Sequence, residues 1–160
     1  MMKKMRKTVS LLLAIVMLSA LLCACGGSSA KNVPVSELSD KVCAALGKTD
    51  MADPGENYVK GYMKRDASEI GEYVIMKNVM GTNIDEFGVF KADKLSTDEL
   101  KGMIEGYLQI LVDSWMNYQP EEKPKLDGAE IKVSGDYVMY CILGDADRDT
   151  AFGAFTDALK

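Results

Sequence analysis

Residues 95–120 have the sequence LSTDELKGMIEGYLQILVDSWMNYQP, and this stretch predicts the longest helix of the chain. Ser96 and Glu99 have the spacing of a capping box, in which each side chain accepts a backbone N–H at the helix start. Apolar residues then recur with the helical period, and Pro120 ends the pattern. These apolar residues are Leu100, Met103, Ile104, Tyr107, Leu108, Leu111, Val112, Trp115 and Tyr118. At 1.5 Å per residue the helix is about 34 Å long, enough to cross a small sheet.

A β-hairpin is predicted after this helix. In residues 129–133 apolar and charged side chains alternate, Ser134-Gly135-Asp136 forms a tight turn, and residues 137–143 are a continuous apolar run typical of a central strand. The charged segment Glu121 to Lys125, which contains a second proline, predicts a loop between the helix and this hairpin.

A second hairpin is predicted before the long helix, with strands at residues 73–76 and 86–92 and a turn at Gly81-Thr82-Asn83. Four further segments have helical patterns or caps, at residues 35–46, 57–64, 66–69 and 150–159.

Two hairpins give an antiparallel sheet of about four strands. The helices need an apolar surface to bury, so the simplest arrangement is an α+β fold in which they cover one face of the sheet as a two-layer sandwich. We expect residues 35–160 to form this single globular domain.

The N-terminus resembles a bacterial lipoprotein signal. A cationic start precedes residues 9–22, an uncharged run too short to span a membrane as a helix. Leu22-Cys23-Ala24-Cys25 resembles a lipobox, in which the cysteine thiol receives a diacylglyceryl group and becomes the new N-terminus. The alternatives are an ordinary secretory signal with a chance cysteine and a retained signal anchor.

On this interpretation residues 1–24 are a lipoprotein signal peptide, Cys25 is the lipidation site, and residues 25–34 are a flexible tether. The domain would lie at the outer face of the bacterial cytoplasmic membrane. Beyond residue 24 the chain has 15 basic and 24 acidic residues, a net charge of −9. Such a surface repels phosphate backbones, so we expect no nucleic-acid partner.

The chain contains no histidine, which excludes Ser-His-Asp and Cys-His catalysis and removes the commonest zinc ligand. It also lacks a glycine-rich phosphate loop. We therefore expect no cofactor and no enzymatic activity.

Asp145, Asp147 and Asp149 are the sharpest candidates for a metal site, because acids at positions 1, 3 and 5 resemble a calcium loop. Thr150 and Thr156 stand where that loop needs Gly and a bidentate Glu. The favoured interpretation is that these acids cap the final helix and complement its dipole.

Cys43 and Cys141 are the candidates for a disulfide, which an extracytoplasmic compartment permits. Both lie in apolar segments, so free thiols are favoured. Trp115, Tyr107 and Tyr118 could line a pocket, but their helical spacing favours a place in the core.

The mature chain resembles a family of small uncharacterised lipoproteins of Gram-positive bacteria, classed as a domain of unknown function. The resemblance rests on the opening helix at residues 35–47, the strand segments 72–74 and 85–91, and residues 135–147. It implies no activity, and only the lipidated Cys25 carries over.

Together these features favour a membrane-anchored binding or accessory module, with the membrane as a partner through the lipid on Cys25 and an unknown protein as a further candidate partner. A cell-wall hydrolase that uses paired carboxylates and a small-ligand receptor are the alternatives.

Overall fold

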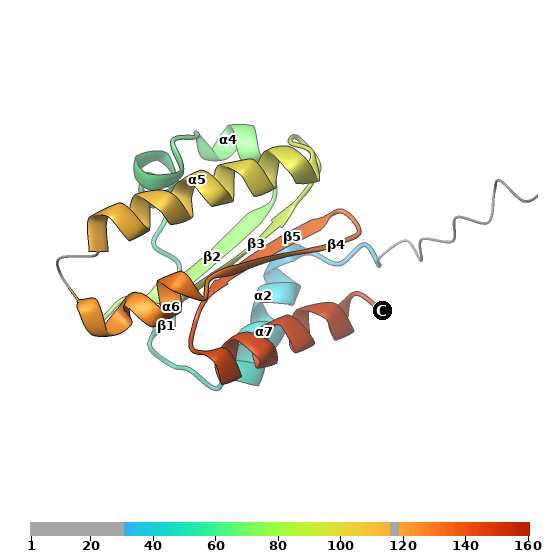
Figure 1. Cartoon of the computed structure of the whole chain (residues 1–160). Helices are drawn as coiled ribbons and strands as arrows, with labels where there is room; N and C mark the ends of the chain where they lie inside the picture. Colours follow the sequence, from blue (N-terminus) through green and yellow to red (C-terminus); the bar gives the residue numbers. More distant parts are fainter. Residues whose placement is uncertain (1–30, 116–118) are drawn as a thin grey trace, which may run out of the picture.

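The computed structural model describes residues 31–115 and 119–160, and within them it confirms the α+β fold. The described residues form one antiparallel sheet of five strands in the order β1-β2-β3-β5-β4 (Figure 1). The strands are β1 (Met51–Ala52), β2 (Tyr73–Asn78), β3 (Glu86–Lys91), β4 (Glu130–Ser134) and β5 (Tyr137–Ile142).

Both predicted hairpins are present, as the pairs β2–β3 and β4–β5, and the antiparallel pairing of β3 with β5 joins them into one sheet. The strand missed by the prediction is β1, which extends the edge beside β2. It has two residues and is followed directly by Asp53-Pro54-Gly55, so it offers no alternating pattern to recognise.

Six α-helices and two short turns of other helical types occur in the described residues. The α-helices are α2 (Val35–Leu46), α3 (Glu56–Tyr58), α4 (Ala67–Ile70), α5 (Thr97–Trp115), α6 (Lys123–Asp127) and α7 (Asp145–Ala158). A π-helical turn, Val59–Met63, follows α3, and a 3₁₀ turn, Pro120–Glu122, precedes α6.

The predicted capping box of α5 is confirmed. The backbone N–H of Ser96 donates to Glu99 Oε2 at 2.9 Å, and the backbone N–H of Glu99 donates to Ser96 Oγ at 3.3 Å. Gly47 ends α2 as predicted, with a left-handed φ of 63° that lets its N–H reach the carbonyl of Cys43.

The loop predicted for Glu121 to Lys125 is wrong, because this segment forms the end of the 3₁₀ turn and the start of α6. Pro120 and Pro124 lie in the first turns of these two short helices. Proline is tolerated there, since the first N–H groups of a helix have no partner within the helix. Counting proline as a helix breaker therefore led to the wrong expectation.

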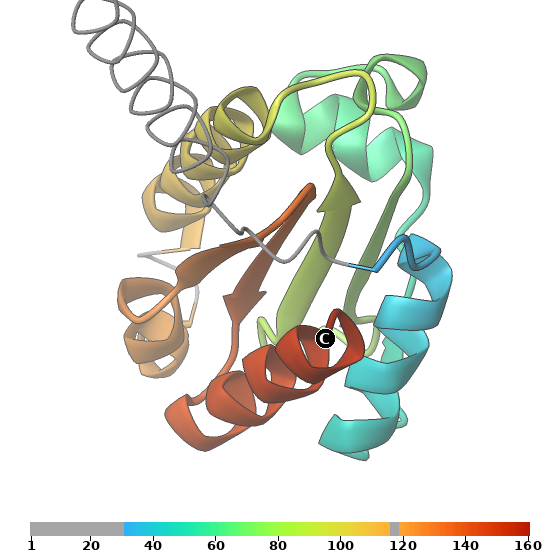
Figure 2. The same cartoon turned by 90° about the vertical axis from the view of Figure 1, so that its right-hand side faces the viewer.

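The sheet is covered on both faces, which corrects the prediction of a two-layer sandwich covered on one face. Helix α5 lies on one side, and α2 and α7 pack together on the other (Figures 1 and 2). Strand β5 explains why, since its side chains alternate between two cores. Tyr137, Met139 and Cys141 face α2 and α7, whereas Val138, Tyr140 and Ile142 face α5. The continuous apolar run at 137–143 was thus the sign of a second covered face.

The folded domain begins before residue 35, which corrects the predicted end of the tether at residue 34. Val33 is buried, and its N–H and carbonyl both hydrogen-bond the hydroxyl of Tyr137, at 2.9 and 2.7 Å. The ammonium of Lys91 donates to Asn32 Oδ1 at 2.7 Å. Residues 31–34 therefore pack against the domain, and the rest of the proposed tether lies outside the described residues.

Candidate functional site

A pocket of about 370 Å³ lies beside the loop that joins β2 to β3. Its walls are mostly apolar. Apart from tyrosine, only two of its lining residues have ionisable side chains, and these two residues lie on neighbouring strands. Apolar walls with a few placed polar groups are typical of small-molecule sites. The lining residues that determine its chemistry are Tyr58, Lys77, Ile84, Glu86, Leu111 and Leu126.

The sheet register places the two charged residues side by side. Lys77 on β2 is the cross-strand partner of Glu86 on β3, and both point to the face covered by α5. Lys77 does not use Glu86 as an ion-pair partner. Its ammonium lies 4.3 Å from the centroid of the Tyr58 ring, and no described carboxylate forms an ion pair with it.

Glu86 is 2% exposed and is surrounded by three tyrosines from three different elements. Tyr58 comes from α3, Tyr107 from α5 and Tyr140 from β5, and all three hydroxyls hydrogen-bond its carboxyl. The oxygen–oxygen distances are 2.9 Å for Tyr58 and 2.6 Å for Tyr107. Burial raises the pKa of each tyrosine, so the hydroxyls keep their hydrogens.

Counting hydrogens indicates that Glu86 is a neutral carboxylic acid. Besides the three contacts to Glu86, the hydroxyl oxygens of Tyr58 and Tyr107 hydrogen-bond each other at 2.6 Å. Four contacts need four hydrogens, and the three hydroxyls supply three. A proton on Glu86 supplies the fourth. Burial agrees with this, since it raises the pKa of Glu86 although the bonds from the tyrosines and the charge of Lys77 act to lower it.

Gly88 makes room for this cluster. It lies opposite Tyr140 in the register of β3 and β5, and a Cβ at this position would be 2.4 Å from Tyr140 Cε1. The Tyr140 ring therefore lies directly over the glycine, which allows its hydroxyl to reach Glu86 two residues away on β3.

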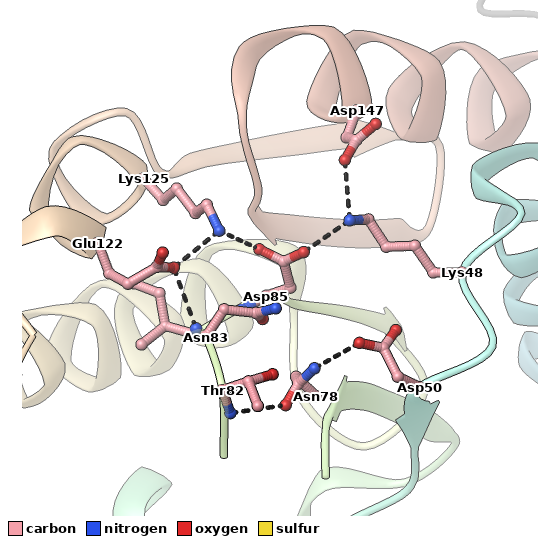
Figure 3. Close-up of polar contacts among 10 residues, drawn as sticks. Lys48, Asp50, Asn78, Thr82, Asn83, Asp85, Glu122, Lys125 and Asp147 are labelled. Atoms are coloured by element: carbon pink, nitrogen blue, oxygen red, sulfur yellow. Dashed lines mark hydrogen bonds and ion pairs between the residues drawn. The ribbon is translucent and has the colours of Figure 1, made fainter. Parts of the chain in front are cut away.

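Asp85, the residue before Glu86, anchors an ion-pair network at the end of the loop that borders the pocket (Figure 3). It is 4% exposed and lies 2.7 Å from the ammonium groups of both Lys48 and Lys125. Burial alone would raise the pKa of Asp85, but the hydrogen bonds and charges of Lys125 and Lys48 outweigh burial and lower it. Lys48 also contacts Asp147 at 3.0 Å, and Lys125 contacts Glu122 at 2.7 Å.

This network holds one wall of the pocket. Glu122, in the 3₁₀ turn before α6, accepts the backbone N–H of Ile84 at 3.2 Å, and Lys125 of α6 pairs with Asp85, so this helical segment and the end of the β2–β3 loop are fixed to each other. On the other side of the loop, Asn78 donates to Asp50 at 2.6 Å and accepts the N–H of Thr82 (Figure 3). Backbone and side-chain bonds at both ends thus define the loop that borders the pocket.

A second hollow, of about 560 Å³, contains the carboxyl groups of Glu56, Asp66 and Asp93. Asp66 forms the capping box of α4 and contacts the Lys60 ammonium at 2.7 Å. Asp93 accepts the backbone N–H of Lys94 at 2.6 Å. Two of the three acids therefore hold local structure.

The three aspartates predicted as a metal site or helix cap lie on the first two turns of α7. Asp147 pairs with Lys48 and Asp145 pairs with Arg148, each at 3.0 Å. No cluster of three metal-ligating side chains occurs within residues 31–115 and 119–160, so the structure does not bring them together as ligands. The prediction that one of these acids caps the helix is also wrong, because the N-cap residue is Gly144. Asp145 and Asp147 lie in the first turn, where their negative charges complement the helix dipole, as expected.

Cys43 on α2 and Cys141 on β5 are free thiols on the same side of the sheet, as favoured from the sequence. Tyr107 is buried, in keeping with a core residue, but its hydroxyl also takes part in the Glu86 cluster. Cys25 and Tyr118 lie outside the described residues. In the part of the chain that the structure describes, no helix is long and apolar enough to cross a membrane.

The pocket of about 370 Å³ that Lys77 lines, here called the Lys77 pocket, was not predicted from the sequence. Tyr58, Lys77, Glu86 and Tyr140 come from four different elements, and their meeting depends on sheet register. One signal was available in the sequence. Asp85 and Glu86 lie at the start of an apolar strand, and a carboxyl group that is buried there needs hydrogen-bond or ion-pair partners.

One comparison with known proteins identifies a family. The family model described as "Domain of unknown function (DUF4358)" matches residues 45–143, more than half of the chain, and these residues include the whole Lys77 pocket. Neither the curated proteins nor the solved structures include a significant match. The chain is therefore a member of the DUF4358 family.

Proposed function

We propose that this protein is a binding module held at the outer face of the bacterial cytoplasmic membrane by a lipid on Cys25, and that it binds a small molecule in the Lys77 pocket. The observation that carries the proposal is the half-buried side chain of Lys77, which borders an apolar pocket and whose ammonium forms no ion pair with a described carboxylate. A ligand in the pocket can supply the missing partner through charge-assisted hydrogen bonds.

The walls of the pocket support a binding role because they are held in place before any ligand arrives. The Asp85 network fixes α6 against the loop, and the hydrogen bonds of the tyrosine cluster hold Tyr58 and Glu86, which line the pocket. A site that needs no ordering on binding loses less entropy when the ligand enters.

The proposal makes binding, rather than catalysis, the activity of this domain. Among the residues that line the Lys77 pocket, Glu86 has the single carboxyl group, and this group forms hydrogen bonds with three tyrosines. A hydrolase with paired carboxylates needs two that face a shared substrate. Two of the three acids of the second hollow, Asp66 and Asp93, have local partners of their own.

A ligand-observed NMR screen tests the pocket. The full chain in phosphatidylcholine nanodiscs is screened against a library of small organic molecules, with empty nanodiscs as the blank. We expect ligands whose binding is lost in Leu126→Trp, which fills the pocket, and retained in Leu126→Met, which keeps its volume. Ligands that bind all three proteins equally would place the site elsewhere.

Cell fractionation tests the anchor, and the chain offers a matched control two residues away. Cys25→Ser should lose the diacylglyceryl mass and leave the membrane fraction or remain unprocessed, because stable attachment depends on the acyl chains. Cys23→Ser should remain lipidated and membrane-bound. Equal membrane attachment of the Cys25→Ser and Cys23→Ser proteins would contradict the anchor.

A further inference from the structure

The charge balance of the Lys77 pocket indicates what kind of molecule it takes. Of its lining residues, only Lys77 and Glu86 have side chains that are ordinarily charged. The four contacts within the tyrosine cluster fit a neutral Glu86, because the three hydroxyls supply three hydrogens and a proton on Glu86 would supply the fourth. Lys77 is then the single charge in the pocket, and that charge is positive.

The position of Lys77 leaves its ammonium available to a ligand. Tyr58 contacts the ammonium through its ring face, which does not use the N–H donors in conventional hydrogen bonds. The side chain is partly exposed and borders the hollow itself. An anionic group in the pocket can therefore accept charge-assisted hydrogen bonds from Lys77 without breaking an existing ion pair.

The rest of the pocket favours an apolar body on the same molecule. Ile84, Leu111 and Leu126 come from the loop, α5 and α6, and each is at most 8% exposed. Burying an apolar group against them removes apolar surface from water on both partners. The mature chain is strongly acidic overall, so an anion without an apolar part would gain little from approaching it.

We infer that the Lys77 pocket binds a soluble amphipathic organic anion, with the acid group at Lys77 and the apolar body against Ile84, Leu111 and Leu126. This inference rests on the proposed binding function and adds the chemical class of its ligand.

Three probes with one body and different head groups test the class. They are 3-phenylpropanoate, its neutral amide and 3-phenylpropylamine, titrated by calorimetry at pH 7 into the full chain in phosphatidylcholine nanodiscs. We expect the carboxylate to bind more tightly than the amide, and the amine to bind least. Lys77→Met should weaken binding of the carboxylate by at least about tenfold, because one charge-assisted hydrogen bond is lost. The same variant should change the affinity for the amide by less than about twofold.

Two variants separate the pocket charge from general effects. Lys77→Arg keeps the charge and should restore tight binding. Lys132→Met removes another lysine that lies over an aromatic ring, 5.3 Å from the centroid of Phe152, but outside the pocket, and should change nothing.

Two results would contradict the proposed ligand class and still support ligand binding in the Lys77 pocket. One is equal binding of all three probes, insensitive to Lys77→Met yet lost in Leu126→Trp. The other is competition with 3-phenylpropanoate by phosphatidylglycerol in the nanodiscs, which would make the anion a membrane lipid. If no probe binds the wild-type chain and the library screen also yields no ligand for the pocket, the proposed binding function fails together with the class.

Discussion

The ring of Tyr140 occupies the space in which a side chain at Gly88 would lie. The two residues are cross-strand partners on β3 and β5, and this placement brings the Tyr140 hydroxyl to the buried carboxyl of Glu86. The absence of a side chain at Gly88 therefore makes room for Tyr140 in the tyrosine cluster.

Gly88→Ala should destabilise the protein, because the added methyl group would overlap the Tyr140 ring. We expect a loss of about 1–3 kcal/mol in the free energy of unfolding, measured by urea denaturation. Gly102→Ala on the exposed face of α5 is the matched control. A Cβ there meets nothing within 4 Å, so alanine should stabilise the helix by about 0.5–1 kcal/mol. Similar effects at the two positions would contradict the steric account.

Asp85→Asn should lower the free energy of unfolding at pH 7 by about 2–3 kcal/mol, because it removes the buried partner of two lysines. The folded protein lowers the pKa of Asp85 below 3.8, so this carboxylate stabilises the fold above that value and its contribution is lost as the pH falls through the folded pKa. The difference between wild type and variant should therefore shrink in acid.

Asp147→Asn is the control for Asp85→Asn, because Asp147 pairs with the same Lys48 but its side chain is 43% exposed. We expect it to cost less than about 1 kcal/mol in the same denaturation experiment. Equal losses from the two variants would mean that burial of Asp85 does not strengthen the network.

Glu86→Gln should have the opposite effect on the pH dependence of stability. The folded state raises the pKa of Glu86 above 4.5, so the folded protein binds this proton more tightly than the unfolded chain. As the pH rises from 4.5 to the folded pKa, the wild type should lose about 1.4 kcal/mol of stability per pH unit from this group, and the glutamine variant should not. Thermal unfolding between pH 4 and pH 8 measures this difference. Parallel curves for the two proteins would contradict a raised pKa.

Cys43 and Cys141 should resist alkylation in the folded protein. Burial raises the pKa of both thiols, which leaves little of the reactive thiolate at neutral pH, and Cys141 is fully buried. Mass spectrometry of the folded protein should show slow modification of the partly exposed Cys43 and none of Cys141 until the chain is unfolded. A gain of two hydrogens on reduction would reveal a disulfide instead.

Much of the fold follows from local sequence patterns. The helical period of residues 100–115, the caps at Ser96 and Gly47, and the two hairpins all appear in the structure where the pattern places them. The second covered face was missed although the apolar run at 137–143 carried the information. A continuous apolar run indicates a strand that is buried on both faces, and this reasoning would have predicted three layers.

The site could not be predicted to the same degree, because it depends on register and on long-range packing. Nothing local to Lys77 indicates that it lies opposite Glu86 or over Tyr58. Tyr107 was recognised as a core residue from its spacing, but its hydroxyl gains a role only when β3 and β5 lie side by side. Side-chain periodicity predicts which face is buried, whereas the chemistry of a buried polar cluster requires the pairing of strands.

The central claim is that Glu86 is a neutral acid, which leaves Lys77 as the single charge of the pocket. The most direct test is a ¹³C NMR titration of the glutamate side-chain carboxyl carbons in the folded full chain, with Glu86→Gln to assign the signal. We expect the Glu86 signal to remain at the position of a protonated carboxyl when the other glutamates have ionised, and to titrate with a midpoint above 4.5. A Glu86 signal that ionises together with the exposed glutamates, or below them, would contradict it.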